Sequence, residues 1–196
     1  FRPREIGQGL IGMGTLQDLS ESLAVDDLRR RADADPLTGL ANRRRLHQLL
    51  GGEAERRGAS TRFAFHYLDL DDFKPVNDTL GHAAGDEVLR IVAQRLLGLV
   101  RQDDLVVRMG GDEFAIVQSG VHDSSSALAL AYKVTAALAE PMVVNGHEVR
   151  IGSSIGVALG DRSTRLGEVC LAADRALYRA KAQGGRCVMV AQDDRG

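Results

Sequence analysis

Several features that mark large classes of protein are missing from this sequence. No run of apolar residues approaches the roughly 20 residues that a membrane-spanning helix needs. The formal net charge is −2, so no basic field predicts binding to nucleic acid or to an anionic membrane surface. The two cysteines, Cys170 and Cys187, lie far apart and outside any CxxC or Cys/His pattern, which argues against a zinc site and a disulfide framework.

The composition that is present fits an ordinary globular domain. The 196 residues are 44% hydrophobic and 27% charged, enough for one domain with a core and a short appendage. Phe1 is not an initiator methionine and no signal-peptide pattern follows it, so we expect a fragment of a longer protein. Reduced thiols indicate a cytoplasmic location, although the full-length protein could be anchored to a membrane outside this fragment.

Hydrophobic periodicity divides most of the chain into helices and strands. Residues 62–70 are apolar and aromatic, typical of a strand, and residues 86–100 carry apolar residues at helical spacing. The glycine-containing pairs 110–111 and 145–146 are turn signals for two β-hairpins. Strands joined partly by hairpins and partly by helices predict an α+β fold, with helices packed around a central sheet. The other predicted elements are helices at 43–57, 123–139 and 166–182 and a strand at 187–191.

Two acidic clusters follow predicted strands. Asp69 and Asp71 share one face of the strand 62–70, because side chains alternate along a strand. Asp112 and Glu113 come directly after the glycine pair of the first hairpin. If the two strands are neighbours, Asp69 and Asp112 converge at one edge of the sheet, where carboxylate oxygens suit Mg²⁺ and a phosphorylated ligand. For either cluster alone, a solvent-exposed acidic loop or an ordinary turn is the simpler explanation.

Polar residues after the first cluster extend the hypothesis of a nucleotide site. Lys74 can neutralise phosphate charge, and Asn77 and Asp86 have the donor and acceptor edges that guanine recognition requires. Spacing alone does not establish base recognition. The simpler explanation for Asp86 is a carboxylate at a helix N-terminus, favoured there by the helix dipole.

Five blocks of the sequence, in order, resemble the GGDEF family, the diguanylate cyclases. They are DPLTGLANRR (35–44), YLDLDDFKPVNDTLGHAAGDEVL (67–89), RMGGDEF (108–114), SIGVA (154–158) and ADRALYRAK (173–181). The resemblance runs from about residue 35 to residue 191. It implies a nucleotidyl-cyclase-like palm fold with a mostly antiparallel sheet, and the bacterial condensation of two GTP into cyclic di-GMP and two pyrophosphates. The implied cofactor is Mg²⁺, with Mn²⁺ as an alternative, and the implied partner is a second GGDEF domain in a homodimer.

The resemblance also implies roles for single residues. Asp69, Asp112 and the carbonyl of Leu70 resemble the metal ligands, and Asp112 is also the implied general base for the attacking 3′-hydroxyl. Glu113 adds negative charge for a second metal or shapes the turn, and Lys74 is implied to stabilise the transition state. The implied substrate contacts are Asp72 and Phe73 at the β-phosphate, Asn77 and Asp86 at guanine, His82, the hairpin glycines Gly110 and Gly111, and Lys181 at the triphosphate.

Some of these residues have plainer explanations. His82 could be a capping or packing histidine, and Lys181 could be a cation that complements the dipole of its helix. The family usually has an arginine four residues after this lysine. Here position 185 is glycine and Arg186 comes one residue later, so one phosphate contact departs from the family pattern.

The segment Arg101-Gln102-Asp103-Asp104 precedes the glycine pair by the offset of the family's RxxD inhibitory site. The resemblance implies that the product, cyclic di-GMP, binds at Arg101 and Asp104. Arginine suits this role because its planar guanidinium hydrogen-bonds guanine or phosphate and stacks on bases. A local ion pair between the two side chains is the alternative.

The first 34 residues differ from the rest of the chain. Residues 1–20 resemble the last strand of a PAS domain, and residues 21–34 are charged and predict a connecting helix that carries a signal into the GGDEF domain at 35–191. Two rival functions remain open. The domain could be a non-catalytic receptor for cyclic di-GMP or GTP, or an interaction module that regulates a neighbouring phosphodiesterase.

Overall fold

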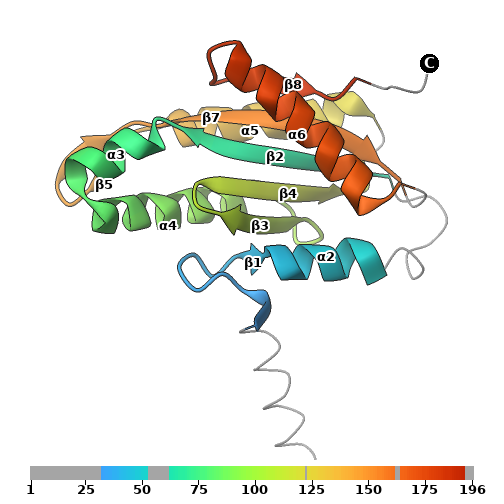
Figure 1. The fold of residues 1–196 in the computed structure, drawn as a ribbon, viewed down its shortest axis with the longest axis horizontal. Helices are drawn as coiled ribbons and strands as arrows, with labels where there is room; N and C mark the ends of the chain where they lie inside the picture. Colours follow the sequence, from blue (N-terminus) through green and yellow to red (C-terminus); the bar gives the residue numbers. More distant parts are fainter. Residues whose placement is uncertain (1–31, 53–61, 122, 162–163, 193–196) are drawn as a thin grey trace, which may run out of the picture.

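The computed structural model describes residues 32–52, 62–121, 123–161 and 164–192. Within these ranges, a six-stranded mixed sheet has the strand order β1-β3-β4-β2-β7-β8 (Figure 1). Its four central strands pair antiparallel, whereas the short edge strands β1 and β8 pair in parallel with β3 and β7. The strands are β1 (Ala41–Asn42), β2 (Phe63–Asp71), β3 (Leu105–Gly110), β4 (Glu113–Ser119), β7 (Gly152–Gly160) and β8 (Val188–Val190). The strands β5 (Met142–Val144) and β6 (His147–Val149) form a separate two-stranded sheet.

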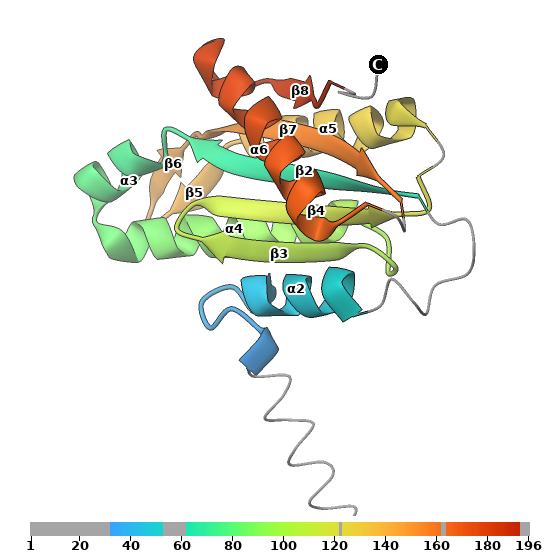
Figure 2. The same ribbon diagram turned by 45° about the vertical axis from the view of Figure 1, so that its right-hand side comes forward.

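Helices cover both faces of the central sheet (Figure 2). One face packs on α4 and α5 and forms the larger hydrophobic core, and α6 crosses the other face with α2 beside it around a smaller core. The short helix α3 follows β2 directly and leads into α4. The helices are α2 (Arg43–Gly52), α3 (Phe73–Leu80), α4 (His82–Leu99), α5 (Ser124–Ala139) and α6 (Leu166–Ala182). No helix of the described ranges has both the length and the apolar character needed to cross a bilayer.

Small residues on β7 determine where α6 lies. A Cβ atom on Gly156 would lie 2.0 Å from the carbonyl oxygen of Ala173, and one on Gly160 would lie 2.9 Å from Cγ2 of Val169. Alternate residues of a strand share a face, so the two glycines form a bare strip on which the helix rests. This close packing carries the C-terminal end of α6 to the end of β2.

The predicted fold class is confirmed, with corrections at several boundaries. The helix predicted at 86–100 begins at His82, and two short elements, α3 and β1, were not predicted. A two-turn helix gives little periodic signal, and Pro75 in its first turn is a residue usually associated with helix ends. The predicted PAS-like tail and most of the connecting helix 21–34 lie outside the described residues.

Candidate functional site

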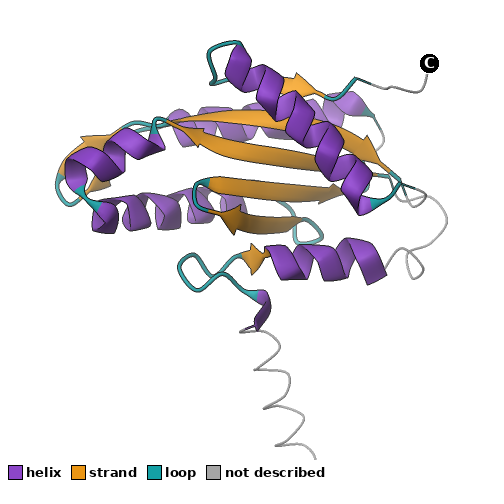
Figure 3. Cartoon of the chain, in the orientation of Figure 1, coloured by secondary structure: helices purple, strands orange, loops and turns teal. Residues whose placement is uncertain are grey.

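The two acidic clusters meet at one end of the sheet. Strand β2 runs antiparallel to β4, and Asp69 near the end of β2 pairs with Glu113 at the start of β4. The N–H of Leu70 donates to the carbonyl of Asp112 at 3.3 Å. Figure 3 shows the β2–α3 junction and the β3–β4 turn at the same end of the sheet. The predicted convergence of Asp69 and Asp112 therefore occurs.

The β3–β4 turn itself requires glycine. Gly110 and Gly111 have φ values of 143° and 54°, in a region that L side chains rarely adopt. Arg108, just before the turn, donates to the carbonyl of Gly111 at 2.9 Å and to the carboxylate of Asp35 at 3.0 Å. Burial raises the pKa of Asp35, but hydrogen bonds from Thr38 and Arg108 lower it more, to below its usual value. This network fixes the hairpin, and no role was predicted for Asp35 or Arg108 from the sequence.

Lys181 reaches into the acidic end of the sheet from α6. Its Nζ lies 2.5 Å from Oδ1 of Asp69 and 2.7 Å from Oδ1 of Asp71. Ser154 on β7 also donates to the Asp71 carboxylate, at 2.9 Å. The alternative explanation of Lys181, a cation that complements the dipole of its helix, does not by itself account for these contacts. Asp71 and Ser154 belong to this network without having been assigned a role, although strand alternation already placed Asp71 beside Asp69.

This end of the sheet carries an excess of negative charge. Burial raises the pKa of Asp69, Lys181 lowers it, and the like charges of Asp112 and Asp71 raise it, leaving it above its usual value. Burial lowers the pKa of Lys181, but the hydrogen bonds from its ammonium to Asp69 and Asp71 raise it more. Asp69 and Asp71 therefore share the ammonium of Lys181, and Asp112 adds a further negative charge near Asp69, so an additional cation at this point would be stabilised.

The donor atoms fit the divalent ion that the family resemblance implies. Among the described residues, no group of three His, Cys, Asp or Glu side chains forms a ready metal cluster. The ammonium of Lys181 instead lies between Asp69 and Asp71 and shows that a cation is accommodated there. Carboxylate and carbonyl oxygens are the ligands that Mg²⁺ and Mn²⁺ prefer. Asp69, Asp112 and the Leu70 carbonyl are the residues that would hold the ion.

Helices α3 and α4 bring the predicted base-binding residues together. A Cβ atom on Gly85 would lie 2.0 Å from Oδ1 of Asn77, so the Asn77 side chain lies directly against the residue that precedes Asp86. Asp86 is the fifth residue of α4, and no acidic residue lies in the first turn of that helix. Its explanation as an N-terminal dipole partner is therefore wrong, because the helix begins earlier than predicted.

The other predicted contacts lie at the start of α3 and at the start of α4. Asp72 precedes the helix with a left-handed backbone (φ 63°), and Phe73 is buried under it. Lys74 is exposed in the first turn. His82 is exposed at the start of α4, where no side chain of the described residues provides a cap. The capping and packing explanations for His82 are therefore not supported.

Arg186 lies at this same end of the sheet. Its N–H donates to Oδ2 of Asp71 at 2.8 Å, and its guanidinium pairs with Asp72 at 2.5 Å. A side chain at position 185 would be strained, since Gly185 has φ 76° and its Cβ would lie 3.0 Å from the Asp71 carboxylate. The local backbone therefore disfavours arginine at 185 and directs the arginine at 186 towards Asp72.

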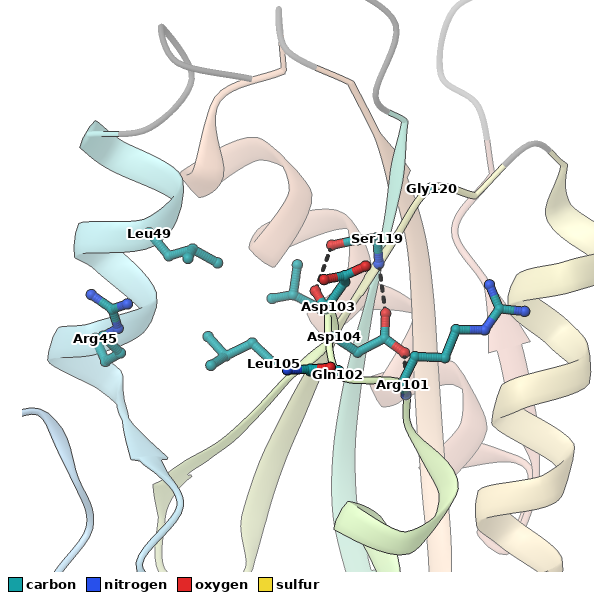
Figure 4. Close-up of a pocket in the computed structure, with 10 residues that line it drawn as sticks. Arg45, Leu49, Arg101, Gln102, Asp103, Asp104, Leu105, Ser119 and Gly120 are labelled. Carbon is teal, nitrogen blue, oxygen red and sulfur yellow. Dashed lines mark hydrogen bonds between the residues drawn. The ribbon is translucent and has the colours of Figure 1, made fainter. Parts of the chain in front are cut away.

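The RxxD segment lies at the opposite end of β3 (Figure 4). The carboxylate of Asp104 accepts hydrogen bonds from the backbone N–H groups of Arg101 and Ser119, both at 2.9 Å. No ion pair of the Arg101 guanidinium is found within the described residues, so the alternative of a local ion pair between Arg101 and Asp104 is wrong. The segment borders a cavity of about 680 Å³ that also touches Arg45 and Leu49 of α2.

The fold and the acidic end of its sheet define a cyclase-like α+β domain. The family model described as "Diguanylate cyclase, GGDEF domain" matches residues 32–187. This chain belongs to the GGDEF family.

Relatives of known name include enzymes of opposite activity. Diguanylate cyclase TpbB from Pseudomonas aeruginosa (strain UCBPP-PA14) is 38% identical over 188 residues, 92% of this chain and 41% of that protein. Cyclic di-GMP phosphodiesterase PdeR from Escherichia coli (strain K12) is 38% identical over 183 residues, 90% of this chain and 26% of that protein. The chain thus spans less than half the length of these two relatives.

A solved structure of a cyclic di-GMP complex is also similar. It is the coiled coil and GGDEF domain of DgcB from Caulobacter crescentus in complex with c-di-GMP. The two structures match with a TM-score of 0.80 and 29% sequence identity, over 92% of this chain and 95% of that chain.

Proposed function

We propose that this chain is an active diguanylate cyclase domain that condenses two GTP into cyclic di-GMP and two pyrophosphates. The observation that carries this proposal is the meeting of Asp69 and Asp112 at one end of the sheet. The carboxylates there carry more negative charge than the ammonium of Lys181 neutralises. Such a point suits a divalent ion and the triphosphate that it would accompany.

The proposed chemistry is a nucleotidyl transfer that takes place twice. The 3′-oxygen of one GTP forms a bond to the α-phosphorus of the other, and the bond from that phosphorus to the pyrophosphate oxygen breaks. Asp112 accepts the proton of the 3′-hydroxyl, and Lys74 neutralises charge that develops on the phosphates. A bound Mg²⁺ or Mn²⁺ supplies Lewis-acid polarisation. Glu113 adds negative charge at the second metal position.

Substrate recognition is proposed for the surrounding elements. Asn77 and Asp86 bind the guanine edge between α3 and α4, with His82 close to them. The backbone at Asp72 and Phe73, where the chain turns from β2 into α3, binds the β-phosphate. The remaining proposed triphosphate contacts are Gly110, Gly111, Lys181 and, in place of the arginine usual at 185, Arg186.

Catalysis is proposed to need two domains. Each domain holds one GTP, so the reacting groups meet only when two active half-sites face each other in a homodimer. Residues 1–20 and 21–34, proposed as a PAS-like remnant and a signalling helix, precede the cyclase domain at 35–191. The proposed location is the bacterial cytoplasm.

Feedback inhibition is proposed for the far end of β3. Cyclic di-GMP would bind at Arg101 and Asp104, in the cavity that Arg45 also lines. Product bound there can link two domains with their active half-sites apart, which lowers the population of the productive pair without distorting the catalytic groups.

The experiment is the initial rate of cyclic di-GMP formation with Mg²⁺, measured over a dilution series of the protein with GTP or ATP as substrate. We expect specific activity to rise with protein concentration and GTP to be strongly preferred, because a site that hydrogen-bonds one base leaves its polar groups unpaired with another. Constant specific activity of a monomer would contradict the half-site mechanism, and equal use of ATP would remove the guanine assignment.

A non-catalytic receptor is the second candidate function. It is favoured by the similarity to a phosphodiesterase and by glycine at position 185. Absence of product at every concentration, together with binding of cyclic di-GMP, would support the receptor and overturn the cyclase.

A further inference from the structure

A hydrogen bond links the glutamate of the hairpin to a tyrosine further back on β2. The hydroxyl of Tyr67 donates to Oε2 of Glu113 at 3.1 Å. Glu113 pairs with Asp69 across the two strands, and Tyr67 precedes Asp69 by two residues. Tyr67 and Glu113 are therefore diagonal neighbours on one face of the sheet, within reach of each other's side chains.

Packing fixes the Tyr67 ring independently of this hydrogen bond. The ring stacks on Phe65, with centroids 6.2 Å apart and an angle of 28° between the planes. Both rings border a cavity of about 600 Å³ between α2 and α6, which Met109 and Cys170 also border. Tyr67 also packs against the smaller hydrophobic core. A ring held by such contacts presents its hydroxyl in one place, so Glu113 meets a donor of fixed position.

We propose that Tyr67 is a positioning residue that orients the Glu113 carboxylate for metal binding. This inference rests on the proposed function, because it assigns Glu113 to the metal position. The hydroxyl engages Oε2 and leaves Oε1 as the oxygen available to an ion. Tyr67 itself touches neither substrate nor ion.

The physical reason is the narrow geometry that Mg²⁺ and similar ions accept. Near-ideal octahedral coordination requires each carboxylate to present its oxygen in a defined direction. Carboxylate ligands are usually held by hydrogen bonds from a second layer of residues, and removing such a partner typically weakens metal affinity about 10- to 100-fold. Without the hydroxyl, the Glu113 side chain would lose conformational entropy when the ion binds, and this cost would lower the affinity for the ion.

The test compares Tyr67→Phe with Tyr132→Phe. Both substitutions remove only a hydroxyl, and Tyr132 is an exposed residue of α5 on the helical layer opposite α6. Binding of Mn²⁺ is measured by electron paramagnetic resonance without turnover, and thermal unfolding is measured in parallel. We expect Tyr67→Phe to bind Mn²⁺ about tenfold more weakly, with an unfolding temperature close to that of Tyr132→Phe. Equal Mn²⁺ affinity in wild type and Tyr67→Phe would overturn the proposal.

A double-mutant cycle separates positioning from a general packing effect. In a Glu113→Gln background, Tyr67→Phe should change Mn²⁺ affinity by less than twofold, because the carboxylate that the hydroxyl orients is gone. Additive effects of the two substitutions would contradict the proposal, even if Tyr67→Phe alone lowers stability. Because turnover is not measured, a domain that binds Mn²⁺ in a Tyr67-dependent way but makes no cyclic di-GMP would overturn only the proposed function.

Discussion

Polar side chains near the two ends of β3 are held by different kinds of contact. At the hairpin end, Asp69 is paired with Lys181, which lies 112 residues later in the chain. At the RxxD end, Asp104 accepts hydrogen bonds from backbone N–H groups three and 15 residues away. The first arrangement depends on the packing of α6 on the sheet. The second is built from a turn and its neighbouring strand, so it leaves the guanidinium of Arg101 available for a ligand.

Distance makes the two ends electrostatically separate. Strand β3 has six residues, and at about 3.3 Å per residue it spans about 20 Å. The Debye length at physiological ionic strength is about 8 Å, so exposed charges at one end are screened from the other. Substitutions at the two ends should therefore have independent effects on turnover and on product binding.

The largest expected effect is that of Asp112→Asn at the hairpin end. It removes a proposed metal ligand and the proposed base while preserving the shape of the side chain, so turnover should fall on the order of 10³-fold. Calorimetric binding of cyclic di-GMP should stay unchanged, which would sharpen the contrast between the two ends. Glu148→Gln on β6 is the control. Near wild-type turnover of Asp112→Asn would remove the assignment.

At the RxxD end, Arg101→Ala should reverse this pattern. It deletes a charge-assisted contact of roughly 1.5–3 kcal/mol, or about 10- to 100-fold in affinity for cyclic di-GMP. Initial rates without product should remain those of the wild type, and inhibition by added product should be relieved. Arg150→Ala, which removes an exposed arginine beside β6, is the matched control. Unchanged product binding would place any feedback elsewhere.

Base selectivity should depend on the hairpin end alone. Asp86→Ala removes one proposed hydrogen-bonding partner of guanine and should lower the ratio of kcat/KM for GTP over ATP by about tenfold. Glu87→Gln, at the next position of α4, is the control, because Glu87 pairs with Arg90 instead. A ratio that is the same in Asp86→Ala and wild type would show that another group selects the base.

The smallest expected effect is that of Arg186→Ala. This exposed guanidinium already has a carboxylate partner in Asp72, so its contribution to phosphate binding should be about fivefold or less in the KM for GTP. The effect should weaken further at high salt, since exposed charges are screened. A KM identical to that of the Arg150→Ala control would show that Arg186 only holds the α6–β8 turn against β2.

The sequence predicted the elements whose signals are local and long. Helix α6 begins and ends at the predicted residues 166 and 182, because its apolar stripe is continuous over almost five turns. The β3–β4 hairpin was predicted from its glycine pair, which the turn requires at positive φ. The sharing of one strand face by Asp69 and Asp71 followed from alternation alone. These features are determined by neighbours in the chain.

Tertiary structure decided which distant groups share the site. Three contacts join residues 46 to 114 positions apart in the sequence. They are the bridge from Lys181 to Asp69 and Asp71, the contact of Arg186 with Asp72, and the hydrogen bond from Tyr67 to Glu113. Such pairings cannot be predicted from the local spacing of residues, because they depend on the packing position of α6 on β7 and on the register between β2 and β4. The sequence by itself determined the family, the principal elements and the candidate residues. Packing decided which charges meet, since the energy of an ion pair depends on distance and burial and not on separation along the chain.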